Sequence, residues 1–152
     1  MAFKIKFHTK WADFDANRHM RHTAYNDYAA ECRVRFLTEN GFGIERFEKD
    51  NIGPVLFKEE TTFYREIKLG EDITVELFLA GMSKNGERFK MFHKIFREDG
   101  VLVAEVKIYA AWLDLEKRKL ISPPTDLVEK TLNNLEKVEN FEEITLKNKS
   151  EV

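Results

Sequence analysis

The chain has 152 residues, of which 43% are hydrophobic and 34% charged, and this is typical of one globular domain with a sizeable core. Its 25 lysines and arginines nearly balance 27 aspartates and glutamates, which argues against a role on nucleic acid or on an anionic membrane. The single cysteine, Cys32, excludes an internal disulfide and any metal site built from several cysteines.

The first predicted element is a strand over residues 3–7, where apolar and charged side chains alternate. This opening lacks the apolar run of a secretory signal, and no later stretch approaches the roughly 18 apolar residues of a membrane-spanning helix. We therefore expect a cytoplasmic protein that does not contact a membrane. A polar stretch over residues 13–22 separates this strand from the next element.

A helix of about five turns is predicted from Thr23, the expected N-cap, to Gly41, the expected stop. Glu31 lies four residues before Arg35 on its polar face. The opposite face repeats apolar side chains at helical spacing and is expected to be buried. Its members are Tyr25, Tyr28, Ala29, Cys32, Phe36 and Leu37. Cys32 is accordingly predicted to be a core residue rather than a nucleophile.

Strands are predicted from Pro54 to about residue 114. Asn85-Gly86 marks a tight hairpin between residues 73–79 and the strand that begins at Arg88, and an Asp-Gly pair marks a second hairpin. The last strand alternates regularly, so one of its faces is expected to be buried. That face carries Leu102, Ala104, Val106, Ile108, Ala110 and Trp112.

Two prolines at 123–124 end the strands, and a short helix is expected from Thr125. This order predicts an α+β fold in which a five-stranded antiparallel sheet wraps around one long central helix, because no helices separate the strands. That architecture is the hot-dog fold. Its exposed edges favour a homodimer or a dimer of dimers. We expect residues 1–137 to form this single domain and residues 138–152 to form a charged, loosely held tail.

The segment between the first strand and the helix carries the residues best suited to chemistry. It runs from Trp11 through Asp15, Arg18, His19 and His22 to Tyr25. An Asp, three residues, a His and then a Tyr six residues later is the motif of hot-dog acyl-CoA thioesterases of the 4-hydroxybenzoyl-CoA thioesterase type. Asp15, His19 and Tyr25 match it in type and spacing, so the chain resembles this family, over roughly residues 3–135.

The resemblance implies hydrolysis of an acyl-CoA or acyl-carrier-protein thioester at a site formed between two subunits. It implies that Asp15 is the catalytic carboxylate, that His19, His22 and Tyr25 are supporting residues, and that no cofactor is needed beyond the coenzyme A of the substrate. It also implies that the first helix amides bind the thioester carbonyl. Elementary electrostatics agrees, since unpaired amides near His22 to Ala24 carry partial positive charge.

A carboxylate opposite these amides can deliver water as a general base, or attack the carbonyl itself and form an anhydride. The sequence leaves both routes open. Asp15 alone also suits a loop-stabilising or helix-capping role. The neighbouring Asp13 is predicted to be structural, either capping the loop or pairing with Arg18 or Arg21.

The chain departs from the family pattern at three positions. Arg18 replaces a frequent glycine, which implies either a different loop path or a cation at the pocket mouth. Arg21 and His22 stand where two asparagines are common. These departures keep open a non-catalytic acyl-CoA-binding module as an alternative to hydrolysis. Dehydration of a hydroxyacyl thioester is a further alternative, although the Gly- and Pro-rich active-site loop of such enzymes is not seen.

Metal sites are not predicted. The residues from Asp13 to Asn17 begin like a calcium loop, but Arg18 and Ala24 stand where glycine and glutamate are required. A zinc site at His19 and His22 would lack a third ligand nearby in the sequence.

Several further polar residues receive no role in the site. Five basic residues suit either the phosphates of coenzyme A or ordinary solvated positions, namely Lys84, Arg88, Lys90, Lys94 and Arg97. His93 is predicted to be a buried or interface histidine, and His8 a solvated one. Glu59 and Glu60 lie on the strand where some hot-dog enzymes place a catalytic acid, and neither is assigned.

Overall fold

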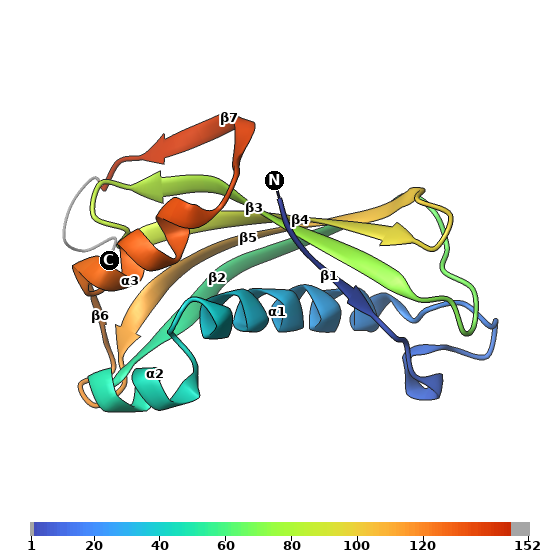
Figure 1. Cartoon of the computed structure of the whole chain (residues 1–152), viewed down its shortest axis with the longest axis horizontal. Helices are drawn as coiled ribbons and strands as arrows, with labels where there is room; N and C mark the ends of the chain where they lie inside the picture. Colours follow the sequence, from blue (N-terminus) through green and yellow to red (C-terminus); the bar gives the residue numbers. More distant parts are fainter. Residues whose placement is uncertain (1, 147–152) are drawn as a thin grey trace.

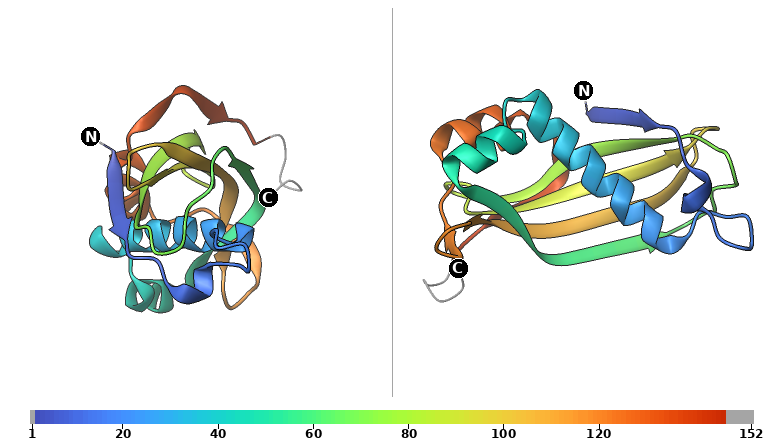
Figure 2. Two further views of the ribbon diagram at one scale, coloured as in Figure 1. Left: turned by 90° about the vertical axis from the view of Figure 1, so that its right-hand side faces the viewer. Right: turned by 90° about the horizontal axis from the view of Figure 1, so that it is seen from below.

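An antiparallel sheet curls around one long helix, as the sequence predicts. The helix, α1 (His22–Glu39), runs along one face of the sheet in Figure 1, and the end-on view in Figure 2 shows the strands arching around it. The computed structural model describes residues 2–146. The main strands follow the order β1-β3-β4-β5-β2. They are β1 (Phe3–Phe7), β2 (Ile52–Phe63), β3 (Ile73–Ser83), β4 (Arg88–Arg97) and β5 (Leu102–Asp114).

The start of α1 differs from the prediction. The N-cap is Arg21, whose backbone is extended, and not Thr23. The Thr23 hydroxyl accepts a hydrogen bond from the Arg21 guanidinium instead of capping a backbone amide. The predicted buried face is confirmed, and the helix ends at Glu39, just before Gly41 with its positive φ of 92°.

The concave face of the sheet supplies the rest of the core. Met91 pairs with Ile108 and His93 with Val106, so β4 and β5 present matching faces to α1. The predicted face of β5 is confirmed from Ala104 to Trp112, while Leu102 is only partly buried. The thiol of Cys32 is buried 3.8 Å from the Val75 carbonyl of β3, and burial raises its pKa to about 12. Cys32 is therefore a core residue, as predicted.

The sheet is larger than the predicted five strands. Within residues 2–146 it has seven, because β6 (Lys119–Ile121) pairs with β5 and β7 (Lys137–Ile144) pairs with β3. β7 is parallel to β3, so the sheet is not wholly antiparallel. β1 occupies the edge of β3 up to Leu77, and β7 continues along that edge from Leu79.

The prediction of a loosely held tail is therefore wrong for residues 138–144. The charged side chains of β7 are compatible with a strand because they are exposed. One of them, Glu142, forms an ion pair with Lys90 at 2.7 Å. Half-buried apolar residues, such as Phe141, pack against the core. The rest of the predicted tail, residues 147–152, lies outside the described residues.

Several short helices complete the fold. The expected helix after the two prolines is present as α3 (Thr125–Lys130), followed by a 3-10 turn, η2 (Leu132–Asn134). A second helix, α2 (Ile44–Asp50), was not predicted, because a short charged segment has no clear apolar face. Its Phe47 packs on Trp112, with ring centroids 6.1 Å apart. No helix within residues 2–146 is both long and apolar enough to cross a membrane.

The hairpin between β3 and β4 depends on Gly86. Its φ is 77°, its carbonyl accepts a 3.0 Å hydrogen bond from the Trp112 indole, and an added Cβ would lie 2.7 Å from a methyl of Val128. We expect Gly86→Ala to lower the free energy of unfolding by about 1–3 kcal/mol through backbone strain and this clash. Urea denaturation measures the change.

Gly100→Ala is the matched control for this hairpin prediction. Gly100 has a similar φ of 84°, but an added Cβ would meet no atom of the described residues within 4 Å. This variant reports backbone strain alone and is expected to lose less stability than Gly86→Ala. Equal losses in the two variants would show that contact with Val128 contributes nothing.

Candidate active site

The segment between β1 and α1 folds back as a small hairpin over residues 14–20. Phe14 pairs with Met20, the Asp15 amide donates to the His19 carbonyl at 3.0 Å, and the Arg18 amide donates to the Asp15 carbonyl at 3.0 Å. The hairpin follows η1 (Trp11–Asp13), a single 3-10 turn, and lies at the same end of the molecule as the start of α1 (Figure 1).

Arg18 takes the left-handed backbone conformation that glycine favours, with a φ of 65°. The path of the loop is thus one that glycine would take, and the arginine adds a cation. Its side chain is exposed and lines a surface pocket of about 390 Å³ together with Asp15, Trp11 and Leu69. Of the two alternatives that the sequence left open at this position, the structure favours a cation beside the pocket.

The two oxygens of the Asp15 carboxylate have different surroundings. Oδ1 accepts hydrogen bonds from the backbone amides of Asn17, at 2.8 Å, and His19, at 3.4 Å. No donor among the described residues binds Oδ2. Asp15 therefore does stabilise its loop, and this same contact orients the carboxylate while one oxygen stays exposed beside the pocket.

His19 is held by an acid that the sequence analysis did not identify. Its Nε2 lies 2.9 Å from Oε2 of Glu66, and both side chains are partly exposed. The hairpin also pairs with the segment around Glu66, because the Met20 amide donates to the Ile67 carbonyl at 2.9 Å and the Leu69 amide to the Arg18 carbonyl at 3.1 Å. Nothing in the sequence signals this pairing.

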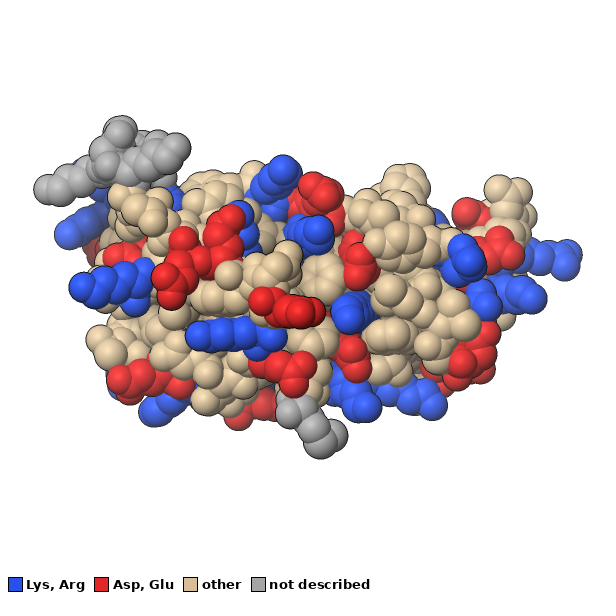
Figure 3. Space-filling model, turned by 90° about the horizontal axis from the view of Figure 1, so that it is seen from above, with Lys and Arg blue, Asp and Glu red and all other residues tan. Residues whose placement is uncertain are grey.

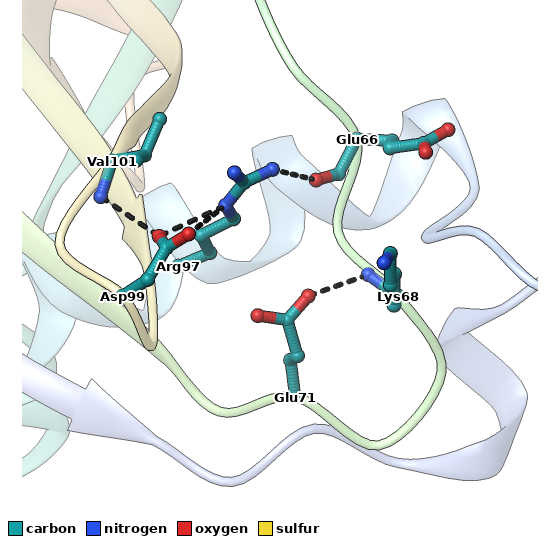
Figure 4. A network of polar contacts seen from close by, with 6 residues as sticks. All are labelled: Glu66, Lys68, Glu71, Arg97, Asp99 and Val101. Atoms are coloured by element: carbon teal, nitrogen blue, oxygen red, sulfur yellow. Dashed lines mark hydrogen bonds and ion pairs between the residues drawn. The ribbon is translucent and has the colours of Figure 1, made fainter.

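A polar network fixes the position of that segment. The Arg97 guanidinium donates to the backbone carbonyl of Glu66 at 3.4 Å and binds Asp99 at 2.9 Å. The Glu71 carboxylate accepts the Lys68 amide at 2.8 Å. Figure 4 shows the Glu66 carboxylate directed away from Arg97, which leaves it available to His19.

Tyr25 is buried in the second turn of α1. Its ring packs edge-on against Phe63 of β2 at 5.0 Å. Burial raises the pKa of its phenol, and the negative charge of Glu66 raises it further. Tyr25 is thus a neutral hydrogen-bond donor near neutral pH, and the carboxylate that contacts His19 also acts on its phenol.

The first turn of α1 offers two free backbone donors. The Ala24 amide, which we expected to be unpaired, donates to the Arg21 carbonyl at 3.0 Å, but the amides of His22 and Thr23 bind no other described residue. The Arg21 side chain ties this turn to η1 through a 3.0 Å hydrogen bond to the Ala12 carbonyl. The His22 side chain is exposed and makes no hydrogen bond to a described residue.

Asp13 has a structural role, as predicted. It is buried, and its Oδ2 accepts hydrogen bonds from the Lys10 amide, at 2.8 Å, and from the Tyr28 hydroxyl. It caps the loop and forms no ion pair with Arg18 or Arg21 within the described residues. Burial and the bond to Asp13 raise the pKa of Tyr28 strongly. Asp13 is therefore buried and held through Oδ2, whereas the Asp15 side chain is exposed.

The five basic residues left without a role mostly have protein partners. Lys90 pairs with Glu142 and Arg97 with Asp99, while Arg88 is buried over the Phe57 ring. Basic and acidic side chains are interspersed over the face seen in Figure 3. His8 is exposed and pairs with Asp72 at 3.0 Å. Within residues 2–146 no group of three or more His, Cys, Asp or Glu side chains is placed to hold a metal ion.

His93 is buried, as predicted, and both of its ring nitrogens have partners within the protein. Its Nδ1 lies 2.9 Å from the Val106 carbonyl, which can only accept, so Nδ1 carries the proton and Nε2 accepts from Arg33 at 3.2 Å. Burial lowers the pKa of His93 to about 3, the nearby charge of Arg33 acts in the same direction, and the Val106 carbonyl opposes it.

This histidine is expected to make stability fall in mild acid. Between about pH 6.5 and the folded pKa of about 3 the unfolded chain binds one more proton at His93, so the free energy of unfolding decreases as pH falls, by up to about 1.4 kcal/mol per pH unit. Urea denaturation at about pH 7 and pH 5 measures this slope. It should become shallower in His93→Gln and remain in the control His8→Gln; an unchanged slope in His93→Gln would contradict the assignment.

Comparison with known proteins adds an independent finding. The sequence profile of the Thioesterase-like superfamily matches residues 9–131. The hypothetical protein SAV2348 from Staphylococcus aureus, solved in complex with CoA, superposes with a TM-score of 0.80 at 20% identity, over 97% of this chain and 89% of that one. Slr0204 from Synechocystis, a 1,4-dihydroxy-2-naphthoyl-CoA thioesterase, gives 0.77 at 15% identity, over 88% and 98%.

A third solved structure, the gentisyl-coenzyme A thioesterase BH1999, superposes with a TM-score of 0.74 at 18% identity, over 84% of this chain and 98% of that one. At such identities these likenesses show the fold, which is the hot-dog fold expected from the order of elements. No curated protein sequence matches the chain.

Proposed function

This chain belongs to the thioesterase-like superfamily, and on that premise we propose that it is an acyl-CoA thioesterase of the 4-hydroxybenzoyl-CoA thioesterase type. It hydrolyses an acyl-CoA or acyl-carrier-protein thioester to a carboxylic acid and a free thiol, and it needs no cofactor. The observation that carries the proposal is the Asp15 carboxylate, oriented through Oδ1 and open at Oδ2 beside a pocket.

In the general-base route, Asp15 takes a proton from water while the water oxygen attacks the thioester carbonyl. The C–S bond then breaks and the proton passes to the departing thiolate. In the nucleophilic route, Asp15 itself attacks, the thiolate leaves, and water hydrolyses the resulting anhydride. Both routes place negative charge on the carbonyl oxygen, which suits the free amides of His22 and Thr23. One such donor is typically worth about a hundredfold to a thousandfold in rate.

We assign supporting roles in this chemistry to His19 and Tyr25, which both interact with Glu66. The Glu66 carboxylate holds the His19 ring in place, and the burial of Tyr25 keeps its phenol protonated. His22 remains an exposed hydrogen-bonding group beside the first helix turn. The CoA bound to the structural relative SAV2348 supports coenzyme A as the carrier of the substrate.

We also propose a homodimer built on β2, which two copies can extend to a dimer of dimers. β2 is the last strand of the main sheet, and within the described residues its outer edge is unpaired. Leu56, Phe57 and Phe63 on this strand are more than 40% exposed. A long free edge with apolar side chains is a template for a second strand. A two-fold homodimer pairs the two β2 strands antiparallel, so a residue at the two-fold axis lies opposite its own copy.

Such a dimer makes the site composite. The carboxyl end of β2 lies beside the start of α1, where the Thr61 hydroxyl binds Asn26 and Phe63 packs on Tyr25. Antiparallel pairing brings that end of one β2 next to the amino end of the other, at Pro54 and Leu56. The Asp15 hairpin and first α1 turn of one subunit then approach the Pro54 side of its partner.

Release of free thiol from a panel of short, long, branched and aromatic acyl-CoAs tests the proposed activity. Hydrolysis of at least one thioester is expected, and the panel gives its class. Binding of acyl-CoA in a thermal-shift assay without hydrolysis of any thioester would contradict the proposal and favour a non-catalytic binding module.

A further inference from the structure

An apolar cavity of about 130 Å³ lies between α1 and the sheet, away from the Asp15 hairpin. Its walls come from α1, β2, β4 and β5, and include Val34, Leu56, Met91 and Trp112. Val34 is 50% exposed and Leu56 43% exposed, so the cavity opens toward the free edge of β2. Among the residues that the structure describes, Arg33 alone lines it with a charged side chain.

Arg33 is a partly buried cation without a carboxylate partner. Its Nη1 lies 3.2 Å from Nε2 of the neutral His93, and within the described residues it forms no ion pair. Burial lowers the pKa of its guanidinium, while Glu59, which is exposed and beyond ion-pair distance, raises it. A guanidinium has five N–H donors, and His93 accepts a hydrogen bond from only one of its nitrogens, Nη1. The positive charge of Arg33 in this apolar wall therefore lowers the stability of the folded protein unless an anion compensates it.

We infer that this cavity binds the acyl group of the substrate and that Arg33 selects acyl groups that end in a carboxylate, the monothioesters of short dicarboxylic acids. The planar guanidinium fork binds a carboxylate in bidentate fashion, and a neutral group would leave its charge uncompensated. The inference rests on the proposed function, because it names the substrate class of the same site.

The size of the cavity limits the length of the acyl group. An engineered protein cavity of about 150 Å³ accommodates benzene, which has six non-hydrogen atoms. Three methylenes and a carboxylate also amount to about six non-hydrogen atoms, so a glutaryl group suits a cavity of about 130 Å³. Its carboxylate would reach Arg33, its methylenes would contact Met91 and Trp112, and its thioester would lie at the open side near Leu56.

That open side is where the β2 dimer brings the catalytic elements of the partner. Leu56 and Pro54 both line the cavity, and they lie opposite the carboxyl end of the partner's β2 in the antiparallel pairing. The acyl group would therefore enter the cavity of one subunit while the thioester carbonyl meets the Asp15 hairpin of the other. Arg33 determines substrate specificity and takes no part in the chemical step.

The test compares kcat/KM for glutaryl-CoA with kcat/KM for hexanoyl-CoA, which has an acyl chain of similar length without the carboxylate. We expect the wild type to prefer glutaryl-CoA by at least about tenfold, and Arg33→Gln to lose or reverse that preference. Glutamine can still donate to His93, so the variant removes the charge with little loss of that hydrogen bond. Arg35→Gln is the control, because Arg35 is on the same helix but pairs with Glu31 and does not line the cavity.

Binding of the same two thioesters to Asp15→Asn, measured by calorimetry, separates this inference from the proposed activity. If no thioester is hydrolysed but glutaryl-CoA binds more tightly and Arg33→Gln in the same background abolishes the difference, the activity fails and the selectivity stands. Equal binding of both thioesters, or a preference that survives in Arg33→Gln, overturns the inference. Loss of the dimer in Arg33→Gln, measured by sedimentation, would assign Arg33 to the subunit interface and overturn it as well.

Discussion

Asp15→Asn is expected to lower kcat for thioester hydrolysis by about 100- to 10,000-fold without unfolding the protein. The asparagine side chain keeps an oxygen that can accept from the amides of Asn17 and His19, so the hairpin retains its hydrogen bonds. The position of Oδ2 becomes an amide nitrogen, which can neither take a proton from water nor attack a carbonyl. Thiol release and circular dichroism on the same preparation measure both effects.

Asp13→Asn is the matched control for this result, since it changes the same chemical group two residues away. Asp13 is buried and bonded to the Lys10 amide and the Tyr28 hydroxyl, so its replacement is expected to lower stability rather than kcat. A wild-type rate in Asp15→Asn would remove Asp15 from the chemical step. It would leave the carboxylate with its loop-stabilising role alone.

The main elements could be predicted because they carry regular burial periods. α1 has a single apolar stripe, and the burial of β5 alternates from Ala104 to Ala110 without a break. β7 could not be predicted, since its half-buried residues Val138, Phe141 and Ile144 recur every three positions, a spacing that matches no half-buried strand. Its place in the sheet comes from tertiary pairing with β3, which is not encoded locally.

The candidate site also combines residues that could be predicted from the sequence with residues that could not. Asp15, His19 and Tyr25 could be found because they are close together in the sequence. Glu66 joins them only through the pairing of His19 with Lys68, and the contact of Arg33 with His93 links a helix to a distant strand. Periodicity predicted that His93 is buried, but it could not show that a cation lies against it.

Mixed dimers are expected to regain activity that their parent variants lack. Asp15→Asn removes the carboxylate, and Ala30→Phe is designed to fill the cavity, since Ala30 lines it from α1. Each homodimer should be poorly active. In a mixed dimer with a composite site, the Asp15 of the Ala30→Phe chain faces the open cavity of the Asp15→Asn chain. Random reassortment makes about half of the dimers mixed, each with one working site of two, so about a quarter of the wild-type activity returns.

A chain that carries both substitutions provides the opposite test, because it is mixed with the wild type. In a composite site neither half of such a mixed dimer is complete, so an equal mixture retains about a quarter of the wild-type activity. A site contained within one subunit would retain about half, because every wild-type chain would keep its own site, and it would show no recovery in the first mixture. A composite site predicts recovery of activity in the first mixture and a loss of more than half in the second. Together the two mixtures decide whether hydrolysis requires pairing at the free edge of β2.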